Sequence, residues 1–258
     1  QRDGSFDALT PLGEKDDKED KRPKFFCACH TNGLKTQRDA WCYNFSIEAL
    51  TANMKRMISN FNRECDKIGE ILRTDEADEC RENVQNYLLS DETQISWSRA
   101  LRNDTLRNRK ATFKTENIVE AVYRPFVKSN LYLDGQFNEV AGIANRAFPH
   151  PPPYKITHQE QNSTQPARIN LVICVSGVGV TKDFSCIITD LIPDLELIGK
   201  SQCFPLYYYT EAAPPAQPSL FGEAGGRGSL ERHSALSPWA VAEARERYGA
   251  GVTDEDVF

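Results

Sequence analysis

Residues Ile118–Phe126, which read IVEAVYRPF, mark the point at which the chain changes from a helical to a strand-like pattern. The β-branched and aromatic residues of this stretch favour a strand, and Arg124-Pro125-Phe126 favours a turn because proline fixes φ and lacks a backbone donor. Leu131-Tyr132-Leu133 then predicts the returning strand of a hairpin. This hairpin separates a mainly helical part of the chain from a strand-rich part.

Apolar residues recur at helical spacing before the hairpin. Ser46 is a suitable N-cap, and the apolar residues that follow it at helical spacing are Ile47, Leu50, Met54, Met57, Ile58 and Phe61. A second helix is expected at about 78–89. A third is expected from about residue 93, with its arginines on the face opposite Trp97 and Leu101.

Strand signals dominate after the hairpin. β-branched and aromatic residues predict strands at 169–175, 184–189 and 203–209, and the segment between the first two predicts a tight hairpin. Ser237-Pro238 opens a final helix that Gly249 ends. Together these patterns predict an α+β fold with a helical N-terminal half, a β-rich half and a C-terminal helix.

The composition of successive segments predicts the organisation of the chain. We expect a linker or arm at 1–24, a mainly helical part at 25–115, a β-rich part at 116–210, a flexible linker at 211–236 and a truncated C-terminal helical segment at 237–258. The chain begins at Gln1 without an initiator Met, and Thr253 signals a helix start five residues before the end. We therefore expect a piece of a longer polypeptide.

Composition and cysteine spacing exclude several classes of protein. The 258 residues are 40% hydrophobic, enough to bury a core. No apolar run approaches the roughly 20 residues of a membrane span. The eight cysteines include one close pair, Cys27 and Cys29 beside His30, without the second pair that structural zinc usually needs. Reduced thiols, a cytoplasmic location, no membrane partner and no metal are therefore expected.

Three kinds of motif invite a catalytic interpretation, and each lacks a necessary part. Pro151–Tyr154 resembles the active-site loop of amino-methyltransferases, but proline replaces the polar residue that accepts from the target amine. Ser176–Lys182 has two glycines and a lysine without the spacing of a phosphate-binding loop. The four histidines form no nucleophile–base pattern, and Asp190 and Asp194 are typical of turns. No catalytic site is predicted.

Basic residues concentrate in one region although the formal net charge is −6. Between Trp97 and Asn130, Lys and Arg outnumber Asp and Glu, with Arg99, Arg102, Arg107, Arg109, Lys110, Lys114, Arg124 and Lys128 against Asp104, Glu116 and Glu120. Because salt screens charges beyond about 8–10 Å, a local basic face on an acidic protein can still bind phosphates. A solvated helix face is the alternative, and charge alone favours it.

Several side chains suit the recognition of a nucleic acid. Arg forks onto guanine, Lys and Thr contact phosphates, and Gln pairs with adenine edges. The candidate residues are Lys35, Arg38, Arg99, Arg102, Arg124, Lys128, Thr181, Lys182 and Gln202. Four aromatic residues, Trp41, Tyr123, Phe126 and Phe184, stand in the same blocks and are equally well interpreted as core anchors. The pattern leaves both interpretations open.

Five short blocks follow one another in a fixed order. They are Lys35–Trp41, Tyr123–Phe126, Thr181–Ser185, Thr189–Asp194 and Gln202–Tyr207. Their order and wording resemble the C-terminal specificity region of single-polypeptide (Type ISP) restriction-modification enzymes, across most of residues 30–209. Members of that family carry a nuclease, an ATP-driven helicase, an adenine N6-methyltransferase and a target recognition domain on one chain. By this resemblance, 25–115 would join the methyltransferase to the recognition domain, and 116–210 would be the recognition domain.

The resemblance implies a module that recognises a sequence in double-stranded DNA and positions the duplex for adenine N6-methylation and restriction by upstream domains. Its partners would be the duplex and the methyltransferase and helicase domains of the same polypeptide. S-adenosylmethionine, ATP and Mg would serve that parent polypeptide, which resembles an adenine-specific DNA methyltransferase, and no cofactor is expected in this piece. Two alternatives stay open: a structural coupling module that does not read DNA, and a self-contained methyltransferase that binds S-adenosylmethionine.

Overall fold

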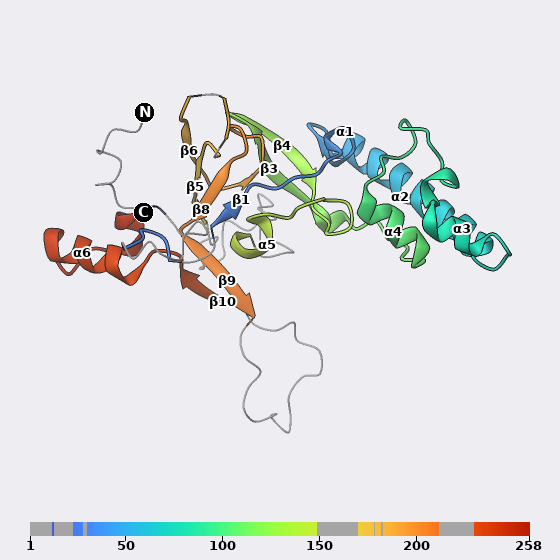
Figure 1. Ribbon diagram of the computed structural model, residues 1–258. Coiled ribbons are helices and arrows are strands. Elements are labelled where there is room, and N and C mark those ends of the chain that lie inside the picture. The colour runs from blue at the N-terminus through green and yellow to red at the C-terminus, as the bar shows by residue number, and fades with distance from the viewer. Residues whose placement is uncertain are drawn as a thin grey trace, which may run out of the picture. The chain divides into compact units, whose positions relative to one another are not determined.

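The computed structural model describes residues 12, 23–27, 30–148, 170–177, 179–181, 183–211 and 230–258. These residues form two compact units, and Figure 1 labels most of their elements. We call Leu34–Gly142 the helical unit, and the described residues before and after it the sheet unit. The expected arm at 1–24 falls largely outside the described residues. Among the described residues, no helix combines the length and the apolar character that crossing a bilayer requires.

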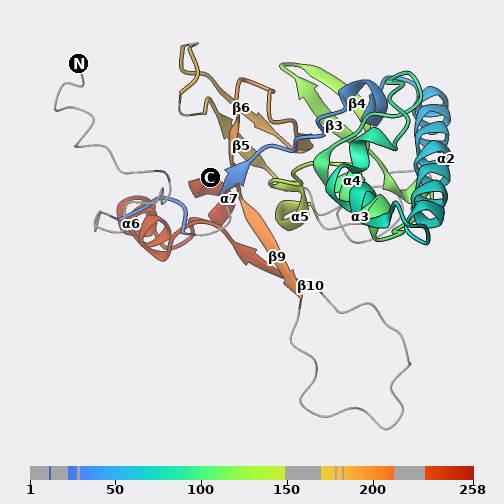
Figure 2. The ribbon, with the colours of Figure 1, turned by 45° about the vertical axis from the view of Figure 1, so that its right-hand side comes forward.

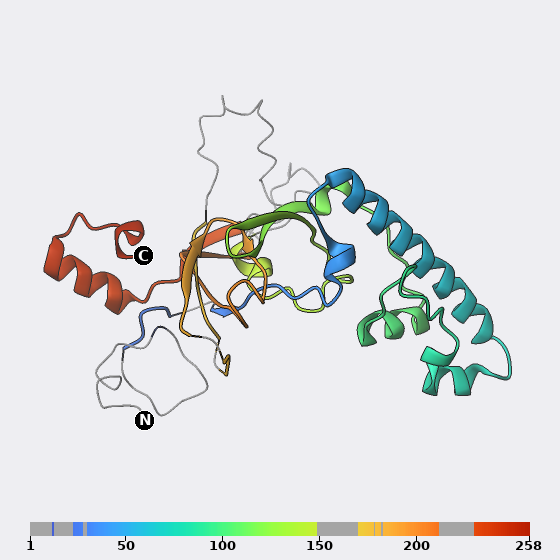
Figure 3. The ribbon, with the colours of Figure 1, turned by 90° about the horizontal axis from the view of Figure 1, so that it is seen from above.

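The helical unit contains four α-helices and a hairpin among its described residues. The elements are α1 Asp39–Cys42, β2 Tyr43–Asn44, α2 Ile47–Ile71, α3 Ala77–Glu82, two 3-10 turns at Val84–Asn86 and Thr115–Asn117, α4 Arg99–Leu106, β3 Ile118–Arg124 and β4 Val127–Tyr132. α3 and α4 pack against the long helix α2, as Figure 2 and Figure 3 show.

Helix α2 begins where the sequence predicts. The Ser46 side chain accepts a hydrogen bond of 3.1 Å from the Ala49 amide, which satisfies one of the free donors of the first turn. The buried face of α2 is formed by Leu50, Met54, Met57, Ile58, Phe61, Cys65 and Ile68. The predicted helical spacing is therefore confirmed as the core stripe of the unit, except that Ile47, the first residue of the predicted series, is exposed.

The two shorter helices differ from expectation. α3 ends at Glu82 and a 3-10 turn follows, whereas one helix was expected to run to about 89. α4 begins at Arg99 rather than near 93, because the Ser98 side chain caps it by accepting from a backbone amide at 3.2 Å. The indole Nε1 of Trp97 donates to the Leu89 carbonyl at 2.7 Å and holds the intervening segment outside the helix.

The predicted hairpin is confirmed, and it belongs to the helical unit. β3 and β4 pair antiparallel, and β2 pairs with the other edge of β4. Tyr132 at the end of β4 is fully buried, with its ring 6.5 Å from that of Phe137, which lies edge-on at 5.9 Å from Phe61 of α2. The boundary expected at 115/116 therefore lies inside one compact unit, because the hairpin completes the core over α2.

The sheet unit contains most of the strands. Its elements are β1 Thr31–Asn32, α5 Ala144–Ala147, β5 Val172–Val175, β6 Cys186–Thr189, β7 Ile192–Pro193, β8 Gln202–Pro205, β9 Tyr207–Glu211, β10 Leu230–Ser234, α6 Pro238–Tyr248 and α7 Asp254–Val257. The α+β fold class is therefore confirmed, with helices early in the chain, strands later and helix α6 near the end.

An antiparallel sheet with strand order β1-β8-β5-β6 organises this unit. β9 and β10 form a separate hairpin, visible in Figure 2. The sequence predicts one strand over 203–209, but the structure has two strands with Leu206 between them. The Leu206 amide donates to the Leu171 carbonyl at 2.8 Å. β8 and β9 therefore belong to different sheets.

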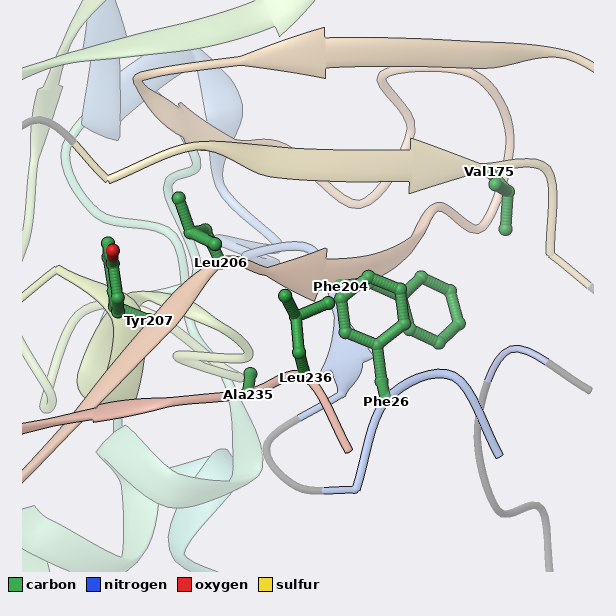
Figure 4. Close-up of a cluster of buried hydrophobic side chains, with 7 residues drawn as sticks. All are labelled: Phe26, Val175, Phe204, Leu206, Tyr207, Ala235 and Leu236. Carbon is green, nitrogen blue, oxygen red and sulfur yellow. The ribbon is translucent and has the colours of Figure 1, made fainter. Parts of the chain in front are cut away.

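One cluster of buried side chains holds the sheet, the C-terminal segment and the chain before β1 together, as Figure 4 shows. It consists of Phe26, Val175, Phe204, Leu206, Tyr207, Ala235 and Leu236. The rings of Phe26 and Phe204 lie 5.1 Å apart, and Phe258 packs edge-on against Phe26 at 6.0 Å. The Thr253 start signal is confirmed as a capping box with Asp256, so α7 delivers the last residue of the chain to this core.

The linker expected at 211–236 needs correction at its C-terminal end. Residues 230–234 form β10 instead of a linker, and Ala235 and Leu236 are buried. The Ala235 amide donates to the Leu206 carbonyl at 2.9 Å, and Leu236 forms a β-bridge with Phe26. Pairing with β9 and burial outweigh the polar local composition. The earlier part of that segment lies outside the described residues.

Candidate nucleic-acid interface

The tip of the β3–β4 hairpin has unusual geometry. Arg124 pairs with Val127, so the hairpin is closed by Pro125 and Phe126 alone. Phe126 has a φ of 62°, in the left-handed region that favours glycine, and its side chain is 92% exposed. Lys128, on the returning strand, is also exposed. The turn thus places an aromatic ring in solvent next to basic side chains.

The base of this tip is held by Asp39, in the first turn of α1. Its carboxylate accepts from the Tyr123 hydroxyl at 3.0 Å and from the Thr36 hydroxyl, and lies 3.5 Å from the Arg124 guanidinium. Arg124 also stacks over the Tyr123 ring at 3.8 Å and donates to the Tyr123 carbonyl at 2.6 Å. Two of the sequence blocks, Lys35–Trp41 and Tyr123–Phe126, therefore meet in one hydrogen-bonded network.

The sequence interpretation missed Asp39 as the residue that holds the base of this tip. It stands inside a block that was singled out, but an acid in the first turn of a helix is common because it complements the helix dipole. Nothing in the local pattern indicates a partner 84 positions away at Tyr123. The network fixes the Arg124 guanidinium, because one terminal nitrogen donates to the Tyr123 carbonyl and the other faces Asp39.

The two basic candidates beside Asp39 lie in less accessible places. Arg38 is 4% exposed and donates to the Thr36 carbonyl at 3.4 Å and to the Phe137 carbonyl. Burial lowers the pKa of its guanidinium, and among the described residues its Nε has no hydrogen-bond partner. Lys35 is half-buried in a β-bridge with Val140. Arg38 therefore shapes the interior of the loop that carries Asp39.

Helix α4 carries its arginines on the outer face, as the sequence predicts. Leu101 and Thr105 are buried, whereas Arg99 is exposed and Arg102 is half-buried. Within the described part of the chain, Arg99, Arg102 and Lys128 form no ion pair. Nearby cations are partly neutralised instead, since Lys110 lies 2.6 Å from Asp66 and Arg109 lies 3.6 Å from Asp104.

The sheet unit displays a hairpin between β5 and β6 as predicted, but residues 176–185 connect the two strands, so the connection is longer than the tight turn expected. The Ser176 amide donates to the Ser185 carbonyl at 3.0 Å, and the Ser185 amide donates to the Ser176 hydroxyl at 2.8 Å. Thr181 is exposed within this hairpin, while Lys182 lies outside the described residues. Gln202 is half-buried on β8, between β1 and β5. The candidates of this unit thus include one exposed side chain and one on an inner strand.

The structure separates the four aromatic candidates into two classes. Trp41 is buried and Tyr123 packs against Tyr43 at 4.6 Å, so these two are anchors. Phe126 and Phe184 are exposed, Phe184 to 75%. Across the residues that the structure describes, no group of three metal-binding side chains gathers. Cys29 and the proline-rich loop at 151–154 lie outside those residues.

A comparison with protein families identifies most of the chain. A family model described as the Type ISP C-terminal specificity domain matches residues 25–258. No curated protein matches the chain. The family match covers both units and the hairpin tip.

Solved structures resemble the whole chain. A cryo-EM structure of a DrdV–DNA complex matches all of it with a TM-score of 0.72 and 22% identity, which shows a shared fold. A nuclease-deletion mutant of the Type ISP restriction-modification enzyme LlaGI, in complex with a DNA substrate mimic, matches 96% of the chain at a TM-score of 0.67 and 27% identity. The ATP-dependent Type ISP enzyme LlaBIII bound to DNA matches 99% at 0.65 and 27% identity. The chain spans 22%, 21% and 14% of these three chains respectively.

Proposed function

This chain belongs to the family of Type ISP C-terminal specificity domains, and from that premise we propose that it recognises a target sequence in double-stranded DNA. The observation that carries the proposal is the β3–β4 tip, where Arg124, Phe126 and Lys128 stand on a base held by Asp39. The LlaGI and LlaBIII structures, determined with a DNA substrate mimic and with DNA, support the same partner for this chain.

We assign different tasks to the basic candidates according to their exposure. Arg124, held in place by Asp39 and Tyr123, contacts a guanine edge or a phosphate. Arg99, Arg102 and Lys128 contact phosphates, which fixes register without reading sequence. In the sheet unit, Thr181, Lys182 and Gln202 are further candidates for contacts with the duplex. Lys35, the second residue of the helical unit, is a further candidate for a phosphate contact. Arg38 acts from the interior by supporting the Asp39 loop.

The finer proposal concerns the polypeptide that contains this domain. The bound duplex is positioned for adenine N6-methylation and restriction by upstream methyltransferase, helicase and nuclease domains. S-adenosylmethionine, ATP and Mg serve those domains, and this domain supplies specificity by holding the target in register. The work takes place in the cytoplasm, where a restriction-modification enzyme meets DNA.

Binding to a randomised duplex pool, followed by selection and sequencing, tests the proposal. The intact protein is used at near-physiological salt, because phosphate contacts alone dominate at low salt. We expect an enriched motif. Retention without enrichment would reduce the role of the domain to phosphate binding, and no retention of folded protein would contradict DNA recognition.

Substitutions at the hairpin tip then assign the contacts. Arg124→Ala is expected to weaken binding to the selected duplex by about 1–3 kcal/mol and to relax preference at one base pair. Arg124→Lys keeps the charge but loses the fork, so preference should still relax. Lys128→Ala should lower the salt slope by about 1. Arg81→Ala is the control, since Arg81 pairs with Asp78 on α3; unchanged affinity and salt slope at both tip residues would refute these assignments.

A coupling module that contacts protein surfaces is the second candidate. The observation in its favour is the apolar face of β6, an edge strand, on which Cys186 and Ile188 follow Phe184 at every second position and all three are exposed. Ile188→Asp would then impair association with the other domains of the polypeptide. If coupling were the sole function, duplex selection by the intact protein would survive every substitution in the β3–β4 tip.

A further inference from the structure

Phe126 occupies a backbone position that ordinarily excludes it. Pro125 restricts the first corner of the turn to a negative φ, and the φ of 62° at Phe126 then gives the pattern of a type II turn. The second corner of such a turn favours glycine or asparagine, because a side chain at positive φ meets its own backbone. A bulky aromatic residue at this corner is strained.

The fold gains little in return for this strain. With 92% of its surface exposed, the Phe126 side chain packs on almost nothing, so it contributes almost no burial to stability. Local rules are commonly broken at functional sites, where the strained arrangement serves a partner. The observation therefore points to a ligand for the ring rather than to a role in the core.

The base of the turn is built to hold the ring in place. The Asp39 carboxylate fixes Tyr123 and Arg124 just before the turn, and Tyr123 packs on the Tyr43 ring. Gln37, two positions before Asp39, is a second exposed residue with a left-handed φ, of 60°. Strained residues thus stand on both loops that Asp39 joins.

We propose that Phe126 is a wedge that inserts between two adjacent base pairs of the DNA duplex and unstacks them. The inference rests on the proposed function and names a new contact of the same interface. A single planar ring at the tip of a two-residue turn can stack between base pairs, and proteins that kink DNA insert apolar side chains of this kind. Arg124 and Lys128, which flank the ring in the chain, would hold the neighbouring phosphates.

A pocket on another protein domain is the competing occupant, and the hairpin tip fits it less well. Protein interfaces bury patches of many side chains around their aromatic anchors. On this hairpin, the residues next to Phe126 are Pro125 and the half-buried Val127, with cations beyond them on both sides. A lone ring flanked by positive charges suits DNA, which offers stacked bases beside phosphates, better than it suits an apolar pocket on a protein.

The test locates the base step that the bound protein opens. The intact protein is titrated with the duplex from the selection experiment, carrying 2-aminopurine at one position after another. We expect fluorescence to rise at a single step when the native protein binds, and Phe126→Ala to abolish that rise. We also expect Phe126→Ala to lower affinity about tenfold to a hundredfold, the range for losing one aromatic stack on a base.

Three further variants separate the wedge from other effects. Phe126→Gly suits the positive φ, so the turn stays folded and the melting temperature stays equal or rises while the fluorescence signal is lost. Phe126→Leu keeps an apolar wedge and should retain part of the signal. Phe45→Ala, at another exposed phenylalanine of the helical unit, should change neither signal nor affinity. A mismatch at the opened step should tighten binding by native protein and not by Phe126→Ala.

The outcomes distinguish this inference from the proposed function. A native protein that binds its duplex without any 2-aminopurine response, or Phe126→Ala that binds and responds like the native protein, overturns the wedge and leaves DNA recognition intact. A native protein that binds no duplex contradicts the proposed function itself. Loss of association with another domain in Phe126→Ala, with DNA binding unchanged, would assign the ring to a protein pocket and also overturn the wedge.

Discussion

The two hairpins β3–β4 and β5–β6 each present an exposed phenylalanine, but they are built differently. The first closes in two residues, and side chains from another segment, centred on Asp39, hold its base. In the second, bonds between Ser176 and Ser185 close a longer segment. A short, braced turn fixes one side chain in one direction, whereas a longer loop displays several. The comparison teaches that a two-residue turn held by a distant side chain restricts where its exposed residue can lie, whereas bonds within a longer segment leave several side chains exposed.

The largest effect is expected from adding a methyl group at Gly177, which follows β5 in the second hairpin. A Cβ at Gly177 would overlap the backbone oxygen of Lys200, and neither backbone can yield easily. Gly177→Ala should therefore destabilise the sheet unit by about 1–3 kcal/mol, measured by urea denaturation. Gly135→Ala in the helical unit is the control, since its Cβ meets nothing within 4 Å. Equal midpoints for the two variants would contradict the close approach.

Removing the brace from the β3–β4 hairpin is expected to have the next largest effect. Asp39→Ala deletes the acceptor for Thr36 and Tyr123 and the partner of Arg124, at a cost of about 1–2 kcal/mol. Amide exchange should quicken in β3 and β4, while β5 and β6 keep their protection. Asp78→Ala, which breaks an exposed ion pair with Arg81, should cost less than about 0.5 kcal/mol. Protection lost evenly from both hairpins would argue against a local brace.

The same substitution at the two exposed phenylalanines should have opposite signs. Phe126→Gly relieves a left-handed φ but adds unfolded-state entropy, for a net gain of up to about 1 kcal/mol. Phe184 has no positive φ, so Phe184→Gly carries the entropy cost alone and should lose about 0.5 kcal/mol. Thermal unfolding of both variants measures the difference. Losses of the same size would mean that the turn at Phe126 is not strained.

The smallest effect concerns pH and the docking of α7 in the sheet unit. The hydrogen bond from Tyr207 lowers the pKa of Glu255. The pKa of Tyr207 is raised to about 12, mainly by burial of its hydroxyl and then by the hydrogen bond to Glu255. The Glu255 contribution is therefore present above its ordinary pKa of 4.5 and is lost as pH falls below that value. The contribution of Tyr207 to stability is present below pH 10, the ordinary pKa of tyrosine, and is lost as the pH rises toward 12.

Tyr207→Phe should flatten the stability profile at both ends of the pH range, as measured by denaturation at a series of pH values. Because Glu255 is exposed, solvent screens the bond and the change should be small. Tyr248→Phe, at an exposed tyrosine on α6, is the matched control and should leave the profile unchanged. If the stability of Tyr207→Phe depends on pH in the same way as that of the native protein, the bond between Tyr207 and Glu255 does not contribute to the pH dependence of stability.

Much of the fold follows from signals that act within a few residues. The caps at Ser46, Ser237 and Thr253 were readable because each side chain bonds to an amide three positions ahead. The stripe of α2 and the β3–β4 and β5–β6 hairpins were predicted for the same reason, since periodicity and turn chemistry are local. The sequence by itself thus determined the α+β class, most of the elements and the family resemblance.

Only the tertiary structure decided which residues meet and which face solvent. The bond between Asp39 and Tyr123 spans 84 positions, and β10 forms only because β9 and the Phe26 cluster receive it. The sequence could not distinguish Arg38 from an exposed arginine, yet Arg38 is buried. The sequence was equally consistent with a buried Phe126, yet Phe126 is exposed to solvent. Burial and long-range partners depend on how distant segments pack, and no local pattern encodes that packing.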